Sequence, residues 1–274
     1  MPESRSGSTS DMEDETKNDV TVPLRGGAEM PMVGLGTWQL HGRQATQAVL
    51  WALEDGYRLL DTATMYRNEA EIGAALQESG VPRDDIFLTT KLPPDHAGSE
   101  RETLQRSLDA LGTDYVDLWL IHWPPGGAGV DTWRAFGELA EQGFARAIGV
   151  SNYSTAQLDE LTRETGTTPA VNQVEWSPLL FDRALLDDHR TRDVVLEGYS
   201  PFKAGRLDDP VLTGIAERHG KTPAQVVVRW HVEHGVVVIP KSASRERLAQ
   251  NFDVFDFALH SDDMTAIDGL AKSD

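Results

Sequence analysis

The sequence predicts a (β/α)8 TIM barrel with an N-terminal β-hairpin and an extra C-terminal helix. Short apolar runs alternate with amphipathic stretches along most of the chain, and strands that alternate with helices form a parallel sheet through right-handed crossovers. Eight such runs in 274 residues match this barrel in number and in length. Polar residues cluster at the carboxyl ends of the runs, which is the face where barrel enzymes carry their sites.

The N-terminal segment divides into a tail and a hairpin. Residues 1–19 are polar and rich in Ser, Asp and Glu, and such a segment cannot bury enough apolar surface to order itself. We therefore expect a disordered acidic tail over 1–19 and a single domain over 20–274. Short apolar stretches flank Gly26 and Gly27, a pattern typical of a β-hairpin.

The eight predicted barrel strands share an apolar body and a polar end. The first lies in 30–36, and the others are 57–61, 86–91, 116–122, 145–152, 170–177, 194–200 and 236–242. Amphipathic stretches with apolar residues three or four positions apart lie between them, and this spacing predicts helices. Examples are 43–56, 68–80, 100–112, 131–143 and 155–166.

A doubly wound sheet is the alternative architecture, and it is disfavoured. Such a sheet needs a glycine-rich turn that opens a helix after its first strand. Here Gly34 and Gly36 are followed by Trp38 and Gln39, where a helix-packing glycine is required.

Composition excludes several functions. The formal net charge of −19 argues against nucleic-acid binding, and the absence of cysteine excludes disulfides and thiolate metal sites. No 18-residue apolar run and no secretory signal are visible, so we expect a cytoplasmic enzyme without a membrane partner. The acidity has two explanations that both stay open: adaptation to concentrated salt, or an ordinary acidic protein.

Residues at the ends of successive strands predict a catalytic cluster. Neighbouring strands lie about 5 Å apart, so Asp61, Lys91 and His122 converge on one point. The full set of polar strand-end residues is Asp61, Lys91, His122, Ser151, Asn152, Gln173, Tyr199, Ser200, Lys241 and Ser242.

This cluster suggests a general acid. Asp61 and Lys91 are expected to pair, since an unpaired charge is costly there, and the ammonium is expected to lower the pKa of Tyr66, in the next loop. Tyr66 then donates a proton near neutrality while His122 orients a substrate oxygen. This chemistry requires no metal. Each residue alone also has a structural explanation, but their occurrence on three consecutive strands favours catalysis.

A second polar cluster follows the last strand. Lys241 and Ser242 end that strand, and Arg247 and Asn251 lie one and two turns into the next helix. Cations beside a helix start at this position of a barrel suit a phosphate, and a guanidinium can also stack on an adenine. A solvated helix start is the alternative explanation.

Taken together, these residues resemble the NADP-dependent aldo-keto reductases. The resemblance runs from about Val22 to Leu270. It rests on motifs in the family's order: GLGTW, LLDTATMYRNEAEIG, TTKL, IHWP, GVSNY, VNQVEWSP, GYSPF and IPKSASRERLAQN. The family's tetrad of aspartate, tyrosine, lysine and histidine falls on Asp61, Tyr66, Lys91 and His122.

The resemblance also implies a cofactor site for NADPH or NADP across the barrel mouth. The nicotinamide is expected on Tyr199, its carboxamide at Ser151, Asn152 and Gln173. The residues implied elsewhere are Gly36 and Thr37 in the first loop, Ser200 and Phe202 along the pyrophosphate, Lys241, Ser242 and Arg247 at the 2′-phosphate, and Gln250 and Asn251 at the adenine. Trp38 and Trp123 resemble aromatic walls of the carbonyl pocket.

Two departures from the family pattern bear on function. Gln250 stands where the family often has Glu, which weakens only the adenine contact. The chain ends four residues after Leu270, so we expect no long C-terminal loop over the pocket, and hence an open, shallow site with broad substrate tolerance.

We therefore expect an NADPH-dependent reductase of aldehydes or ketones that acts as a monomer on a small carbonyl substrate. Oxidation of an alcohol or sugar with NADP and a non-catalytic NADPH-sensing barrel are the alternatives. A barrel isomerase or aldolase is compatible with the fold alone, but the cofactor motifs speak against it.

Overall fold

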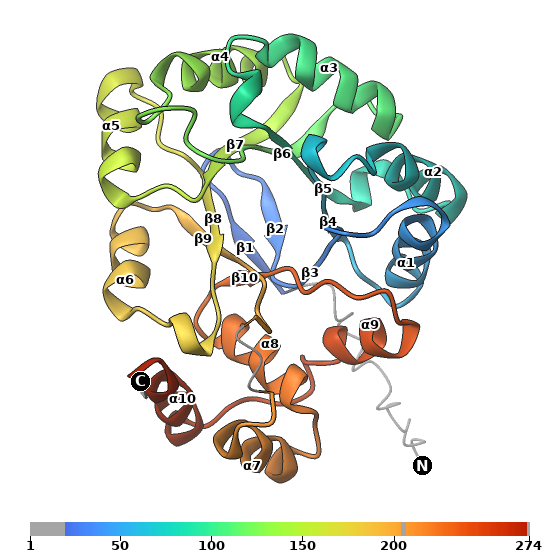
Figure 1. The fold of residues 1–274 in the computed structure, drawn as a ribbon, viewed down its shortest axis with the longest axis vertical. Coiled ribbons are helices and arrows are strands. Elements are labelled where there is room, and N and C mark those ends of the chain that lie inside the picture. Colours follow the sequence, from blue (N-terminus) through green and yellow to red (C-terminus); the bar gives the residue numbers. More distant parts are fainter. Residues whose placement is uncertain (1–19, 204–206, 273–274) are drawn as a thin grey trace, which may run out of the picture.

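A computed structural model describes residues 20–203 and 207–272 of the protein (Figure 1). The tail predicted over 1–19 lies outside the described residues. Eight parallel strands form a barrel and follow one another in chain order, as predicted. They are β3 (Gly34–Gly36), β4 (Leu59–Asp61), β5 (Phe87–Leu92), β6 (Val116–Ile121), β7 (Ala145–Ser151), β8 (Val171–Glu175), β9 (Val195–Tyr199) and β10 (Val237–Val238).

The barrel is closed between its first and last strands. Val33 forms a parallel bridge with Val238, and the amide of Val238 donates to the carbonyl of Met32 at 2.9 Å. Gly36 permits this close approach, because a Cβ at that position would lie 2.7 Å from the carbonyl oxygen of Ile239. A closed parallel barrel rules out the doubly wound alternative.

Helices surround the barrel (Figure 1). Capping boxes formed by Ser154 with Gln157 and by Thr222 with Gln225 begin two of them, because these side chains satisfy free amides of the first turn. The helices are α1 (Gly42–Glu54), α2 (Glu69–Ser79), α3 (Glu100–Leu111), α4 (Val130–Glu141), α5 (Thr155–Thr165), α6 (Arg183–Thr191), α7 (Pro210–His219), α8 (Pro223–Glu233), α9 (Arg245–Phe252) and α10 (Ser261–Asp268), with short 3-10 turns η1 (Thr64–Tyr66), η2 (Arg83–Asp85), η3 (Pro94–His96), η4 (Pro178–Leu180) and η5 (Gly269–Lys272).

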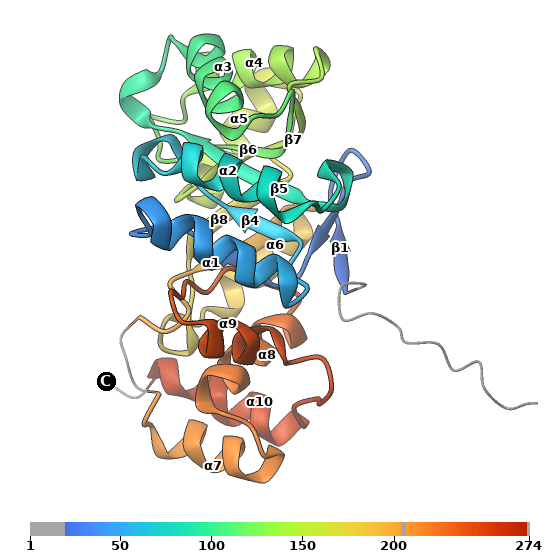
Figure 2. The same cartoon turned by 90° about the vertical axis from the view of Figure 1, so that its right-hand side faces the viewer.

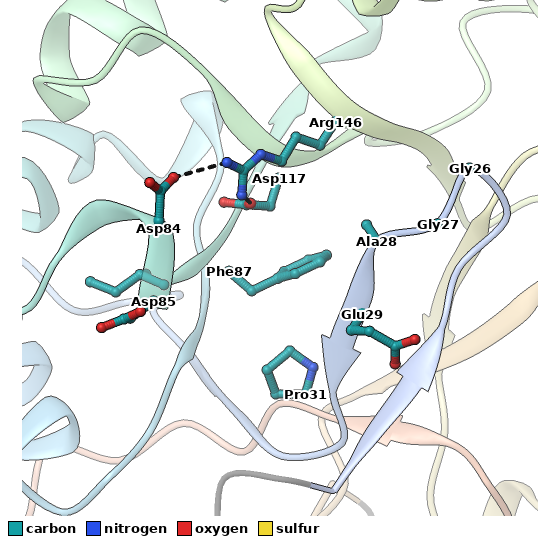
Figure 3. Close-up of a pocket in the computed structure, with 11 residues that line it drawn as sticks. Gly26, Gly27, Ala28, Glu29, Pro31, Asp84, Asp85, Phe87, Asp117 and Arg146 are labelled. Atoms are coloured by element: carbon teal, nitrogen blue, oxygen red, sulfur yellow. Dashed lines mark hydrogen bonds and ion pairs between the residues drawn. The ribbon is translucent and has the colours of Figure 1, made fainter.

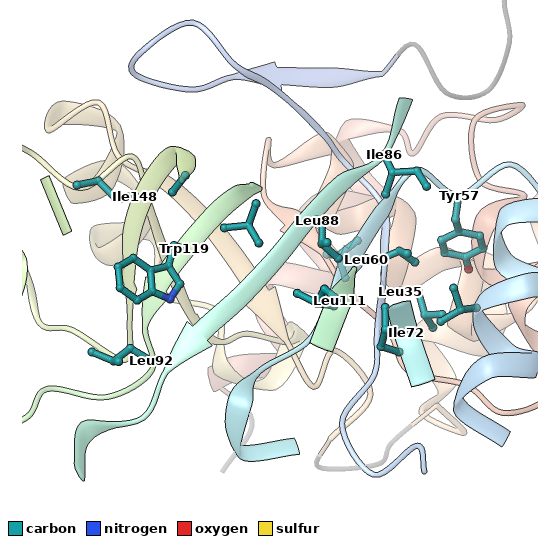
Figure 4. Close-up of a cluster of buried hydrophobic side chains, with 14 of the residues drawn as sticks. Leu35, Tyr57, Leu60, Ile72, Ile86, Leu88, Leu92, Leu111, Trp119 and Ile148 are labelled. Carbon is teal, nitrogen blue, oxygen red and sulfur yellow. The ribbon is translucent and has the colours of Figure 1, made fainter. Parts of the chain in front are cut away.

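The apolar core lies mainly between the strands and the helices. Leu35, Leu60, Leu88 and Trp119 point outward from successive strands into this layer (Figure 4). Trp119 stacks on Phe136 of α4 with ring centroids 3.6 Å apart. Residues of the opposite strand faces fill the barrel interior, among them Leu59, Phe87, Leu118, Leu120, Val171 and Val237. The apolar runs predicted from the sequence therefore reflect burial on both faces.

The predicted hairpin covers the end of the barrel where the strands begin (Figure 2). It consists of β1 (Thr21–Pro23) and β2 (Glu29–Pro31), which pair antiparallel. A cavity of about 470 Å³ lies between the hairpin and the barrel. Arg146 binds Asp84 at 2.9 Å and Asp117 at 3.0 Å there (Figure 3), so the cation that lines this cavity is paired within the protein.

The expected C-terminal helix is α10, and buried polar groups hold it. Asp263 binds Arg218 and His219 of α7. Asp268 binds Arg183 and accepts a hydrogen bond from the indole nitrogen of Trp230 at 2.8 Å. In the part of the chain that the structure describes, every helix is too short or too polar to cross a bilayer.

Candidate active site

A cavity of about 370 Å³ opens at the carboxyl ends of the strands. It lies at the end of the barrel opposite the hairpin, as the clustering of polar strand-end residues predicts. Twelve residues singled out in the sequence line it: Gly36, Trp38, Asp61, Tyr66, His122, Trp123, Ser151, Asn152, Gln173, Tyr199, Ser200 and Lys241.

A buried ion pair forms the floor of this cavity. Strands β4 and β5 are neighbours, and their register brings the side chains of Asp61 and Lys91 together inside the barrel. Lys91 Nζ lies 2.6 Å and 2.7 Å from the two carboxylate oxygens of Asp61 and 2.9 Å from the carbonyl of Thr62. Burial acts to lower the pKa of Lys91, but the charges of Asp61 and its other neighbours outweigh it and raise that pKa. Lys91 is therefore a permanent cation.

Tyr66 lies directly above this cation. It ends the turn η1 that follows β4, and Lys91 Nζ lies 3.4 Å from its hydroxyl oxygen. The structure corrects one expectation here, because the pKa of Tyr66 is raised. Burial is the largest cause, and although Lys91 lowers the pKa as expected, its effect is smaller. Tyr66 is thus held as a neutral phenol at neutral pH, able to donate a proton.

His122 faces Tyr66 from the next strand. It follows β6, and its ring centroid lies 5.7 Å from that of Tyr66 in an edge-on arrangement. Burial, with the nearby charge of Lys91, lowers the pKa of His122 to about 3, so the imidazole is neutral. Nδ1 has no hydrogen-bond partner among the described residues. Burying Nδ1 as an unsatisfied acceptor costs less free energy than burying it as an unsatisfied N–H donor, so we place the proton on Nε2.

Asn68, which the sequence analysis missed, fixes the loop that carries Tyr66. This fully buried side chain donates to the carbonyls of Thr37 and Leu40, both at 2.9 Å, and accepts from the hydroxyl of Thr62 at 2.7 Å. It thereby ties the loop after β3 to the loop after β4. The available signal was its place in the sequence, two residues after Tyr66 and at the start of a predicted helix.

The opposite wall is a hydrogen-bonded set. Tyr199 donates to the amide oxygen of Asn152 at 2.8 Å, and Asn152 donates to the carbonyl of His122 at 3.2 Å. Gln173 donates to Asp61 at 2.8 Å and connects this wall to the buried ion pair. Asn152 and Ser200 have left-handed backbones, with φ of 63° and 55°. Such strain in residues other than glycine is concentrated at functional sites.

Exposed apolar side chains form the rim. Trp38 and Trp123 are 55% and 46% exposed, and Met65, absent from the sequence-based set, is 53% exposed. Lys203 and Ile239 also line the cavity and were not predicted. Lys203 pairs with Glu175 at 3.0 Å. The cavity therefore has a charged floor and a wide, apolar mouth.

Seven of the predicted residues lie outside the cavity wall. Lys91 lies beneath it, and Thr37 is buried, with its hydroxyl bound to the carbonyl of Asp61 at 2.9 Å. Phe202 borders a separate small cavity beside Ser177 and Pro178. The others, Ser242, Arg247, Gln250 and Asn251, lie on or just before α9, where Arg247 occupies the first turn and not the second.

Glu197 is another buried residue that the sequence analysis missed. It lies on β9 beside Gln173 of β8 and is fully buried. Burial and the charge of Asp61 raise the pKa of Glu197 to about 8, opposed by Gln173 and Lys91. Its position inside an apolar run, two residues before Tyr199 and so on the same face of the strand, was a readable signal.

Comparisons with known proteins agree with this geometry. The aldo/keto reductase family model matches residues 32–272. An aldo-keto reductase of Mycolicibacterium smegmatis is 50% identical over 254 residues, covering 91% of this chain and 92% of that protein. The glyoxal reductase of Bacillus subtilis is 45% identical over 258 residues, covering 93% of this chain and 94% of that protein.

Solved structures give the same result. An aldo/keto reductase from Brucella melitensis superposes with a TM-score of 0.89 at 46% identity, covering 91% of this chain and 98% of that one. A Bombyx mori aldo-keto reductase in complex with NADP superposes with a TM-score of 0.86 at 34% identity, covering 91% and 92%.

The closed barrel with a polar cluster at the carboxyl ends of its strands defines a (β/α)8-barrel enzyme. The sequence and structure matches extend over nearly all of the barrel domain. The chain belongs to the aldo/keto reductase family and is an oxidoreductase.

Proposed function

We propose that the protein reduces aldehydes or ketones to alcohols with NADPH and that Tyr66 is the general acid. The observation that carries the proposal is the position of Lys91, whose ammonium is bound to Asp61 and also lies 3.4 Å from the Tyr66 hydroxyl. A cation in that place stabilises the phenolate that remains after proton donation. Tyr66, Lys91, Asp61 and His122 thus form the proposed tetrad.

The residues around the cavity suit a nicotinamide cofactor, which supplies a hydride when bound. Tyr199 offers an aromatic ring fixed by Asn152, and Ser151 and Gln173 offer polar groups beside it. Lys241 and Arg247 are exposed and form no ion pair among the described residues, although the protein is strongly acidic. Two free cations near one helix start suit a phosphate. The Bombyx mori relative, which contains NADP, supports the same assignment.

The chain's own side chains would act on the carbonyl oxygen. The neutral His122 donates a hydrogen bond from Nε2 and orients the oxygen, and Tyr66 transfers its proton to it. Asp61 holds Lys91 in place beneath Tyr66, and Gln173 holds Asp61. The proton therefore comes from a group whose conjugate base is stabilised at once by a fixed charge.

The wide mouth suggests small carbonyls, dicarbonyls or keto-sugars as substrates. Three large apolar side chains at the rim are about half exposed, and they would contact a substrate without enclosing it. The relative from Bacillus subtilis is a glyoxal reductase, which is consistent with a small dicarbonyl. The same residues would also catalyse alcohol oxidation with NADP, and tight NADPH binding without turnover would instead indicate a sensing role.

Absorbance measurements of NADPH consumption against aldehydes, ketones, dicarbonyls and keto-sugars test the activity. Arg247→Ala tests the cofactor site, with Arg245→Ala as the matched control because Arg245 belongs to the same helix but pairs with Glu54. We expect the Kd for NADPH to rise about tenfold in Arg247→Ala, the effect of one charge-assisted hydrogen bond. The Kd of Arg245→Ala for NADPH and the Kd of Arg247→Ala for NADH are expected to stay unchanged. Equal Kd values for NADPH and NADH in the unmodified protein would contradict the assignment.

A further inference from the structure

Glu197 is a carboxyl group in the barrel interior that the proposed mechanism does not use. Its side chain is fully buried, and neither carboxyl oxygen has a hydrogen-bond partner among the described residues that meets ordinary geometry. The neighbouring Gln173 amide donates to Asp61, although it lies near enough to Glu197 to oppose the rise in its pKa. A buried ionised carboxylate without partners is very costly. The surroundings of Glu197 therefore determine whether it carries a charge.

The charges around Glu197 come from the strands and the turn across the barrel. Asp61 of β4 and Lys91 of β5 act on it, and Tyr66 in η1 is affected by it in turn. Its strand neighbours are Gln173 of β8 and Val237 of β10, neither of them ionisable. Tyr199 is the next residue on the same face of β9, and His231 of α8 packs against Gly198.

A charge count follows from these neighbours. Among the described residues the interior holds one ammonium, that of Lys91, which both oxygens of Asp61 already bind. A second carboxylate at Glu197 would leave one uncompensated negative charge in a dry core. Such a charge is avoided when the carboxyl group keeps its proton.

We propose that Glu197 is a positioning residue of the active centre, which holds a proton in the barrel interior beside Gln173, the residue that binds Asp61, so that Asp61 alone balances the ammonium. This leaves the positive charge of Lys91 available to the phenolate of Tyr66. The inference rests on the proposed function for its consequence in catalysis, but the protonation of Glu197 is independent of it.

Ionisation of Glu197 has a definite effect on Tyr66. The negative charge of Glu197 raises the pKa of Tyr66, so it disfavours the phenolate that alcohol oxidation requires as a base. Because its pKa is raised to about 8, Glu197 is expected to ionise only above that pH. Above that pH, oxidation is therefore held back, and its pH profile is displaced towards higher pH.

The first test is the pH profile of kcat for alcohol oxidation in Glu197→Gln, which cannot ionise. We expect its midpoint to move to lower pH by about one unit, the effect typical of a single nearby charge. Glu175→Gln is the matched control, because Glu175 is on the adjacent strand but pairs with Lys203 at the surface. Its midpoint is expected to stay in place. A profile of Glu197→Gln that superposes on that of the unmodified protein would overturn the action of Glu197 on Tyr66, and hence its role as a positioning residue. The proton on Glu197 is decided by a second test.

The second test measures stability and needs no activity. Between the ordinary carboxyl pKa of about 4.3 and the folded value of about 8, the folded protein binds one proton more than the unfolded chain. Its folding equilibrium constant therefore falls about tenfold per pH unit relative to Glu197→Gln as the pH rises. Denaturant unfolding of both proteins at about pH 5, 6, 7 and 8 measures the ratio of their folding equilibrium constants.

Glu197→Leu is a second variant, which fills the space without a polar group. We expect the stability of the unmodified protein relative to Glu197→Leu to fall with pH as it does relative to Glu197→Gln. A stability difference that is constant with pH in both variants would overturn the proposal. A protein without oxidoreductase activity would contradict the proposed function, while the unfolding data would still decide on the proton at Glu197.

Discussion

Both carboxylate oxygens of Asp61 lie within 2.7 Å of the ammonium of Lys91, on neighbouring strands inside the barrel. The pair is almost fully buried. Because each charge is compensated by the other, the ammonium persists in a place where a lone lysine would lose its proton. Stability and the proposed chemistry thus depend on the same contact.

Lys91→Met is expected to destabilise the protein. It leaves the carboxylate of Asp61 buried without its cation, and breaking a buried ion pair in this way costs about 3–5 kcal/mol. Urea unfolding measures the loss. The double variant Asp61→Asn with Lys91→Met is expected to recover part of it, since neither charge remains. If the losses of stability in Lys91→Met and in Asp61→Asn, each measured alone, add up to the loss in the double variant, the two side chains are not coupled.

The neutrality of His122 predicts a pH dependence of stability. The folded-state pKa is about 3 and the unfolded value is about 6.5, so between these values the unfolded chain binds one proton more. The free energy of unfolding therefore falls by about 1.4 kcal/mol per pH unit as the pH decreases below 6.5. His122→Asn is expected to lose this contribution. If the free energies of unfolding of the two proteins fall in parallel as the pH decreases, His122 takes up its proton in the folded state as well, which would contradict its neutrality.

Two glycines predict opposite effects of the same substitution. A Cβ at Gly149, in β7, would lie 2.6 Å from the carbonyl oxygen of Val171, so Gly149→Ala overfills the barrel and is expected to cost about 1–3 kcal/mol. Gly137 lies in α4 with no atom near the same position, so Gly137→Ala is expected to stabilise by about 1 kcal/mol. Thermal melts compare them. Equal effects of the two substitutions would contradict the packing described at β7.

The net charge predicts a response to salt. With 44 acidic and 25 basic residues, self-repulsion destabilises the folded state in dilute buffer, and concentrated salt screens it. The Tm is expected to rise between dilute buffer and molar KCl. A Tm that stays constant or falls would argue against adaptation of this surface to concentrated salt.

The barrel strands, and the proximity of Asp61, Lys91 and His122 at their ends, could be predicted because they depend on local patterns. Apolar runs with polar ends identified the strands, and parallel pairing placed their ends together. The pKa of Tyr66 could not be predicted, because its direction depends on how deeply the side chain is buried. The charge of Lys91 alone predicts a lowered pKa for Tyr66, which is the wrong direction.

The unpredicted residues were those whose roles depend on contacts across the fold. Asn68 joins two loops, because it donates to the carbonyls of Thr37 and Leu40, which lie 31 and 28 residues earlier in the chain. Phe202 belongs to a predicted motif, yet it borders another cavity. Glu197 was visible as a charge in an apolar strand, but its relation to Asp61 required the closed barrel.

The measurement that tests the central claim most directly is the kcat of Tyr66→Phe for NADPH-dependent carbonyl reduction, together with its Kd for NADPH. The substitution removes only the hydroxyl group that lies 3.4 Å from Lys91. Loss of a general acid predicts a kcat about 100- to 10,000-fold lower, with an unchanged Kd for NADPH. A variant that turns over as fast as the unmodified protein would contradict the assignment of Tyr66 as the proton donor.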